Sequence, residues 1–435
     1  MTAETTADAA PSAATHASIG VLGAASLVAG SMVGSGVYLL PATLGAIGSI
    51  SILGWLAAGL AALAIAGVFI QLAPLAPQAR GVPAYIQAGL GPAFGVQSAV
   101  LYWCSIWFGL VPLSLAAAGA LGFVFPALDP PGVRLALTVA IIWLGIAAAW
   151  AGPRIVARVE GWTLLIGLAP VILTATIGWF AFRPEVFVAS WNPQDLSLLA
   201  AAKASGLNCF WAFLGIECAA AAASVVRDPV RNVPRATVLG VVGVMAIYVA
   251  VTVVMMGLLP HDRLASSNAP FADAAHLAMG AGAGVAIAAC MALRASGCLT
   301  GWMLVASETT RTAADAGDFP ALFRSRSGER MSLAGLLAPG VLMTVEAVLS
   351  AQPNLAQQFS TLTNVTSLLC LYTYLMAAVS LMRVAGRGRP MAIATAGVAV
   401  LATLGLIGSA KPLELGLSLL PLAAAGLLYL WLRRR

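Results

Sequence analysis

The chain has 435 residues, of which 60% are hydrophobic and only 9% are charged, and its formal net charge is +6. Soluble globular chains carry about 25% charged residues, so a surface facing water on all sides cannot be built from this composition. The composition therefore excludes an ordinary soluble enzyme and indicates a membrane protein. The positive charge comes from loop arginines and does not indicate a nucleic-acid partner.

Long apolar segments recur along the whole chain. A helix needs about 20 mostly apolar residues to cross the hydrocarbon core of a bilayer. Continuous apolarity predicts helices rather than the alternating strands of a membrane barrel. We therefore expect an all-α membrane protein with twelve transmembrane helices. The predicted spans are 18–46, 50–73, 93–123, 134–151, 156–181, 200–225, 236–258, 280–307, 333–351, 358–382, 390–409 and 413–431.

The spans group into three predicted regions. Residues 1–17 are polar and lack the basic stretch and short apolar core of a signal peptide, so we predict a disordered cytoplasmic tail. Residues 18–385 form a predicted ten-helix transport core, and residues 386–435 add two C-terminal helices.

Basic residues are distributed unevenly between the two sides of the predicted membrane. With the N-terminus inside, 16 of the 22 lysines and arginines fall in the tails and loops on that side, and 5 fall outside. The positive-inside rule therefore predicts a multi-pass protein of the bacterial inner (plasma) membrane with both termini in the cytoplasm. The six cysteines all lie in predicted spans without metal-ligand or disulfide spacing, so we expect no metal and no cofactor.

Two predicted spans are interrupted near their middle. The first span contains Gly34, Ser35 and Gly36 in a row, and the sixth contains Gly215 followed shortly by Glu217. Interrupted segments at matching places in two halves of a chain indicate the binding site of a transporter. Spans 1 and 6 are five apart, which predicts two five-helix halves related by an inverted repeat.

A break leaves backbone groups without partners, at a cost of several kcal/mol per group (order of magnitude) in hydrocarbon. The half-helix that begins near Gly36 would offer N–H groups to a carboxylate. The half-helix that ends near Leu214 would offer carbonyls to an ammonium. Together they predict a cradle for the charged head of an amino acid. The alternative is that Gly34 and Gly36 only allow close packing of another helix.

Several motifs together resemble a known family. They are 34–42 at the first break, 100–103, 152–154, 211–217, the loop 228–237, 301–302 and 313–320. In combination they resemble the basic amino acid/polyamine antiporters of the amino acid–polyamine–organocation superfamily, and most of all its arginine/agmatine exchangers. The resemblance covers nearly the whole chain past residue 18. It implies a LeuT-like fold with broken helices 1 and 6, antiport by alternating access, and a homodimer.

The resemblance also assigns roles to individual residues. Ser35 and Gly36 would bind the substrate carboxylate, the carbonyls of Met32, Trp211 and Leu214 would bind its ammonium, and Trp211 would stack on its side chain. A layer beneath the substrate would gate the cavity and respond to pH. The implied substrate-binding set is Met32, Ser35, Gly36, Trp211, Leu214 and Thr366, and the implied gating layer is Tyr102, Glu217 and Trp302.

Two positions depart from the arginine/agmatine exchangers. Leu110 stands where those proteins have a side-chain amide for the guanidinium, and Thr366 stands where they have a serine. The hydroxyl is therefore kept and the amide is lost. This departure argues against arginine or agmatine as the substrate more than against the transport mechanism.

Two ionisable residues inside predicted spans require an explanation, since a charge there costs at least about 2.5 kcal/mol on insertion scales. Glu217 is either a counter-charge for a cationic substrate, a switch that responds to protonation, or a structural carboxylate. Arg294 needs a partner, for which Glu160 and Glu346 are the candidates. Arg294 then forms a structural ion pair, supplies a fixed charge near spans 1 and 8, or reads an acidic substrate.

The sequence predicts a secondary transporter rather than an enzyme. It would exchange a cationic amino acid for its amine or a polyamine. Its predicted partners are the small-molecule substrate and the lipid bilayer. Leu110 motivates an alternative, the transport of neutral amino acids. A membrane-embedded enzyme and a channel are rivals of other classes, but the buried ionisable groups are scattered and no span carries a continuous polar face.

Overall fold

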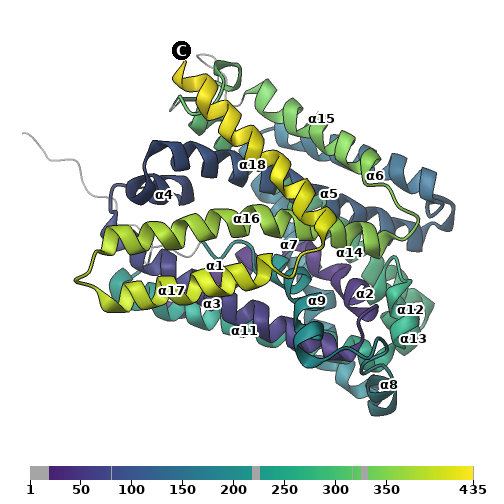
Figure 1. Cartoon of the computed structure of the whole chain (residues 1–435). Coiled ribbons are helices and arrows are strands. Elements are labelled where there is room, and N and C mark those ends of the chain that lie inside the picture. Colours follow the sequence, from purple (N-terminus) through teal and green to yellow (C-terminus); the bar gives the residue numbers. More distant parts are fainter. Residues whose placement is uncertain (1–18, 80, 218–225, 316, 325–331, 435) are drawn as a thin grey trace, which may run out of the picture.

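The computed structural model describes residues 19–79, 81–217, 226–315, 317–324 and 332–434, so the predicted tail 1–17 lies outside the described part. The described residues are helical, and the only strand-like pairing among them is a single bridge between Ile19 and Val226 (Figure 1). The helices are α1 (Val21–Met32), α2 (Leu40–Gly45), α3 (Ile52–Leu75), α4 (Val82–Leu90), α5 (Pro92–Val124), α6 (Pro131–Trp150), α7 (Pro153–Thr176), α8 (Pro184–Ala189), α9 (Leu198–Trp211), α11 (Pro229–Leu258), α12 (His261–Ala265), α13 (Pro270–Met279), α14 (Ala281–Asp315), α15 (Leu333–Leu349), α16 (Leu355–Ala385), α17 (Pro390–Ile407) and α18 (Pro412–Arg433). Short 3-10 turns connect them at η1 (Ser35–Tyr38), η2 (Ser49–Ser51), η3 (Pro126–Leu128), η4 (Ile177–Ala181) and η6 (Ala321–Phe323).

Nine helices of the described part are long and apolar enough to cross a membrane, and they are α3, α5, α6, α7, α11, α14, α16, α17 and α18. The first predicted span is bent, with 61° between Val21–Met32 and Gly36–Gly45, and would make a tenth. α15 is apolar but has 17 residues, and the second half of the sixth predicted span falls at 218–225, outside the described residues. The count of twelve therefore stays a prediction.

The helix contacts follow a pattern with a five-span period. α1 packs on α11 and α9 packs on α3, which in predicted spans are the pairs 1–7 and 6–2. Likewise, α7 packs on α14 and α16 packs on α5, which are the pairs 5–8 and 10–3. Replacing each span by its equivalent five positions along the chain converts the pair 1–7 into 6–2 and the pair 5–8 into 10–3. A repeat of five helices requires this relation.

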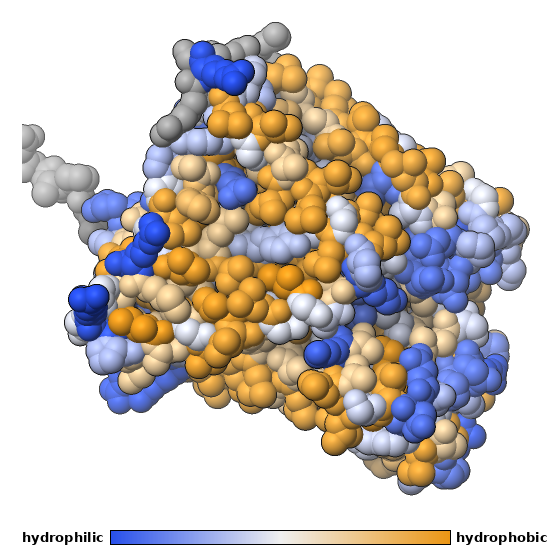
Figure 2. Space-filling model, in the orientation of Figure 1, coloured by the Kyte–Doolittle hydropathy of each residue, from blue (hydrophilic) through white to orange (hydrophobic). Residues whose placement is uncertain are grey.

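The outer surface of the helices is suited to hydrocarbon. In Figure 2 the face over α16, α17 and α18 is predominantly hydrophobic, and hydrophilic residues gather toward the two ends of the helices. Leu401 and Leu427, on α17 and α18, are 73% and 68% exposed. Apolar patches of this extent are rare on monomeric soluble proteins. The chain is a multi-pass membrane protein.

One buried carboxylate lies outside the lining of the site described below. Glu346 of α15 is 8% exposed, and neither of its oxygens has a hydrogen-bond partner within the described ranges. We expect Glu346→Leu to raise the stability of the protein by about 1–3 kcal/mol, because two buried polar atoms without partners are removed. Thermal unfolding in detergent measures this, with Glu346→Gln as the isosteric control. A destabilised Glu346→Leu variant would show that the carboxylate has a partner after all.

Candidate substrate-binding site

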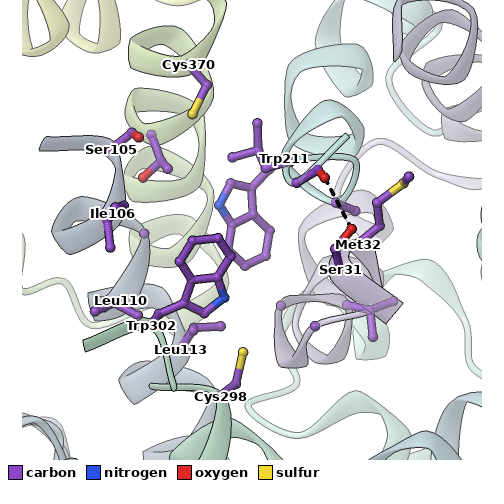
Figure 3. A pocket seen from close by; sticks show the side chains of 18 of the residues that line it. Ser31, Met32, Ser105, Ile106, Leu110, Leu113, Trp211, Cys298, Trp302 and Cys370 are labelled. Carbon is purple, nitrogen blue, oxygen red and sulfur yellow. Dashed lines mark hydrogen bonds between the residues drawn. The ribbon is translucent and has the colours of Figure 1, made fainter. Parts of the chain in front are cut away.

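A cavity lies where the break after α1 faces α5, α9, α14 and α16 (Figure 3). The volume of the cavity is about 100 Å³, which is enough for several waters or a small solute. Every residue of the predicted gating layer lines it, and so does every residue of the predicted substrate-binding set except Ser35. Ser35 begins η1, and its side chain lies outside the described part.

The first wall of the cavity is backbone. α1 ends at Met32, and Gly34 is extended before the chain turns into η1. The indole of Trp211 lies directly on Gly36, since a Cβ atom built on Gly36 would come within 1.7 Å of the ring. Only glycine lets the two approach so closely. This contact is what the packing alternative expects, and the binding of a carboxylate by Gly36 stays a prediction.

We expect Gly36→Ala to lower the affinity for substrate by about 5- to 150-fold, because forcing a methyl group into this contact costs about 1–3 kcal/mol. Trp211 cannot yield freely, since its ring packs edge-to-face on Phe359 at 5.3 Å between centroids. Gly34→Ala is the matched control, because its nearest neighbour would be the sulfur of Cys298 at an ordinary 3.9 Å. Equal losses in a binding assay for both variants would contradict the role of Gly36.

The second wall comes from the end of α9. Its last helical residue is Trp211, and the chain continues through turns to Glu217, with Gly215 at a φ of +102° that favours glycine. The hydroxyl of Ser31 donates to the carbonyl of Gly215 at 3.2 Å and to that of Val28 at 2.7 Å. The end of α1 and the end of α9 therefore touch, which brings the two predicted break regions into one site.

The carbonyl of Met32 has partners that the sequence did not indicate. It accepts hydrogen bonds from the hydroxyl of Tyr248 at 3.0 Å and from the N–H of Gly34 at 2.8 Å. A carbonyl has two lone pairs, so both are occupied in this conformation. For Met32 to bind an ammonium as predicted, at least one of these donors must move away.

The carboxylate of Glu217 lies between two tyrosines. Tyr102 of α5 donates to Oε1 at 3.1 Å, and Tyr374 of α16 donates to Oε2 at 2.7 Å. Hydrogen bonds to an ionised acceptor are about twice as strong as neutral ones. Tyr374 was missed from the sequence, and its position inside a span, where a hydroxyl needs a partner, is the signal that could have identified it. The two tyrosines fix the carboxylate at the edge of the cavity.

The remaining walls are largely apolar. Ile106, Leu110 and Leu113 line the cavity from successive turns of α5, and among the described lining residues there is no side-chain amide. Thr366 also lines it, but its hydroxyl donates to the carbonyl of Leu362 in its own helix at 2.9 Å. These walls suit a hydrocarbon stem better than a second polar group.

Two indoles enter the cavity from different helices. In Figure 3, Trp211 points inward from the end of α9 and Trp302 points inward from α14. The face of an indole attracts an ammonium with about 0.5–2 kcal/mol. The pair can therefore stack on a cationic or aliphatic part of a solute.

The charge at Arg294 lies behind the cavity, between α14 and α7. Its side chain is 5% exposed, and Nη1 lies 3.9 Å from Oε1 of Glu160, the nearer of the two predicted partners. The aliphatic part of Arg294 packs on Gly167, where a Cβ would come within 2.3 Å of it. Arg294 does not line the cavity, so the structure does not support the hypothesis that Arg294 binds an acidic substrate.

Comparisons with known proteins identify the family. A profile of the amino acid permease family matches residues 19–410. The cadaverine/lysine antiporter of Escherichia coli K12 is 35% identical over 374 residues, which cover 85% of this chain and 84% of the relative. The putrescine transporter PotE of the same strain is 30% identical over 351 residues, or 80% of each chain.

A solved structure gives the same fold. MhsT in complex with L-phenylalanine superposes with a TM-score of 0.61 over 90% of this chain and 98% of that one, at 15% identity. At this identity the similarity concerns the fold alone, and it makes the arrangement LeuT-like. From the profile match, the two relatives and this fold, we conclude that the chain is a transporter, not an enzyme, and belongs to the amino acid permease family of the amino acid–polyamine–organocation superfamily.

Proposed function

We propose that the protein exchanges a cationic amino acid with an aliphatic stem, of the lysine type, for an aliphatic diamine. The observation that carries this proposal is the carboxylate of Glu217, held by two tyrosine hydroxyls at the edge of a cavity that α5 lines with Leu110 and Leu113. A terminal ammonium would meet Glu217, and the stem would lie against Leu110. The relatives named for cadaverine, lysine and putrescine support this class of substrate.

The break residues would hold the other end of the substrate. Backbone N–H groups at Ser35 and Gly36 would bind the carboxylate of the amino acid. The carbonyls near Trp211 and Leu214, and that of Met32 once Tyr248 withdraws, would bind the α-ammonium. A diamine lacks the carboxylate, so the same cavity would bind it through ammonium contacts alone. Both substrates could then use one site alternately, as exchange requires.

We further propose that the chain works as a homodimer with both termini in the cytoplasm. The distribution of basic residues supports the orientation. The ten-helix region 18–385 would carry out transport, and the helices of 386–435 would be appended to it. Tyr102, Glu217 and Trp302 would gate the path toward the cytoplasm.

Counterflow in proteoliposomes tests the proposal. Vesicles preloaded with cadaverine or putrescine should take up radiolabelled lysine much faster than empty vesicles, and preloaded arginine or agmatine should drive less uptake, because the described lining offers no amide to a guanidinium. Preloaded leucine and alanine address the one rival that an observation favours, the transport of neutral amino acids along the apolar α5 wall. Uptake driven only by neutral amino acids would show that the cationic assignment is wrong.

A further inference from the structure

A second cavity lies at one end of the long helices, where α12 and α13 meet the end of α5 (Figure 1). The volume of this outer cavity is about 300 Å³, three times that of the central cavity and at the lower end of the range of small-molecule sites, about 300–1,000 Å³. Its lining is mainly polar and includes Asp129, Arg263 and Asp273. In the proposed orientation these residues lie outside, because their segments connect the third span to the fourth and the seventh to the eighth.

The carboxylate of Asp129 is fixed at the wall of the outer cavity. Arg134, which is 5% exposed, donates from Nη1 to Oδ1 of Asp129 at 3.2 Å and to its backbone carbonyl at 3.1 Å. The side-chain amide of Asn268 donates to the same Oδ1 at 3.0 Å. No described residue donates a hydrogen bond to Oδ2, and the side chain of Asp129 is 46% exposed. One carboxylate oxygen is therefore held in place and available to a ligand.

Two further charges in the lining have opposite signs. Asp273, in the first turn of α13, accepts a hydrogen bond from the hydroxyl of Ser267 at Oδ2, and no described residue donates to its Oδ1. Arg263, which is exposed on α12, forms neither an ion pair nor a side-chain hydrogen bond with any described residue. The described lining therefore combines two carboxylates that can accept from ammonium groups with one guanidinium that can pair with a carboxylate.

We propose that the outer cavity is a second binding site, for an α-amino acid that carries a further ammonium, of the lysine type. Arg263 binds the carboxylate, and Asp129 and Asp273 bind the two ammonium groups. A diamine has no carboxylate, so it leaves Arg263 beside two cations, and like charges repel. The outer cavity therefore favours the amino acid over the diamine. The choice of lysine rests on the proposed function, whereas the charge pattern of the lining does not.

The outer cavity adjoins the elements that form the central site. Two residues before Asp273, Phe271 packs edge-to-face on Tyr38 of η1, with 5.7 Å between ring centroids. The segment before α13 also lies tightly on α5, since a Cβ atom built on Gly119 would come within 2.4 Å of the carbonyl oxygen of Asn268. A bound amino acid is therefore close to the break of the first span, on the side where external substrate arrives.

A photoreactive lysine with a diazirine in its side chain and both ammonium groups intact tests for the site in the purified full chain. Labelling should map to 259–273 as well as to residues of the central cavity. Unlabelled lysine should displace it from both places, and cadaverine should displace it less readily from 259–273. Labelling of the central residues alone would overturn this proposal and leave the proposed function standing. Labelling of 259–273 alone would do the reverse.

Two aspartates provide a matched pair of variants. Asp273 lines the outer cavity, and Asp262 is exposed on α12 but does not line it. Asp273→Asn should raise the lysine concentration that half-displaces a trace of the probe from 259–273 by about threefold to tenfold, because one partly exposed charge contact is lost. Asp262→Asn, which makes the same change of charge, should leave this concentration unaltered.

A third variant separates a binding role from a structural one. Arg263 is exposed, so Arg263→Gln should leave the protein folded. This variant should require more lysine but less cadaverine to displace the probe from 259–273, because the guanidinium that binds the carboxylate and repels the diamine is removed. A purely structural contribution would shift both concentrations in the same direction. That result, or equal displacement in Asp273→Asn and Asp262→Asn, would overturn the proposal.

Discussion

Glu217→Gln should reduce the exchange of lysine and diamines by a factor of about thirty to several thousand. Removing one member of a buried, hydrogen-bonded charge pair costs about 2–5 kcal/mol, and the missing carboxylate is the only charge in the described lining of the cavity. The amide keeps the shape of the side chain, so the loss reports on charge. Counterflow at a range of substrate concentrations measures it.

Two tyrosine variants provide a comparison for the loss of exchange in Glu217→Gln. Tyr374→Phe and Tyr102→Phe each remove one hydroxyl from a carboxylate that stays in place, so each should cost only about threefold to tenfold. If Glu217→Gln keeps full exchange with an unchanged pH profile, the carboxylate has neither a substrate role nor a gating role. It would then be a structural group that holds Tyr102 and Tyr374.

Glu160→Gln should destabilise the protein by about 1–3 kcal/mol, because it takes the carboxylate away from the buried guanidinium of Arg294, although Nη1 lies 3.9 Å from it and has no hydrogen-bond partner among the described residues. The two partners are unequally buried, with the side chain of Arg294 5% exposed and that of Glu160 38% exposed. Arg294→Met removes the more deeply buried charge and leaves a carboxylate that is partly exposed. We therefore expect Arg294→Met to cost clearly less than Glu160→Gln. Thermal unfolding in detergent gives both values.

The double variant decides whether the two residues act as a pair. Glu160→Gln with Arg294→Met should recover most of the stability lost in Glu160→Gln alone, and the difference is the interaction energy. Strictly additive losses would show that Glu160 is not the partner of Arg294. The remaining hypothesis would then be the fixed charge near the first span.

Much of this architecture could be predicted because the membrane leaves few alternatives. Long apolar segments can only become helices there, and glycines beside a buried carboxylate mark the place where helices end. The sequence indicated Gly36, Trp211 and Glu217 by these rules and by resemblance, and the structure brings them to one cavity.

The partners of these groups could not be predicted in the same way. Tyr248 lies more than two hundred residues from the Met32 carbonyl that it binds, and Tyr374 lies 157 residues from Glu217. A tyrosine inside a span signals that its hydroxyl needs a partner, but it does not indicate which residue that partner is. The choice of Glu160 over Glu346 for Arg294 also depends on which helices pack together, since both carboxylates lie in apolar segments.

The hydroxyl of Tyr38, in η1, donates to the carbonyl of Gly167 in α7 at 2.6 Å, and Tyr38 is 1% exposed. If η1 moves during exchange and keeps this bond, it must carry the middle of α7 with it. If the bond breaks, a buried hydroxyl is left unpaired at a cost of about 1–3 kcal/mol. The rate at which the first span rearranges should therefore depend partly on α7, the fifth span. The hydrogen bond links the two spans mechanically, although no residue of α7 lines the cavity.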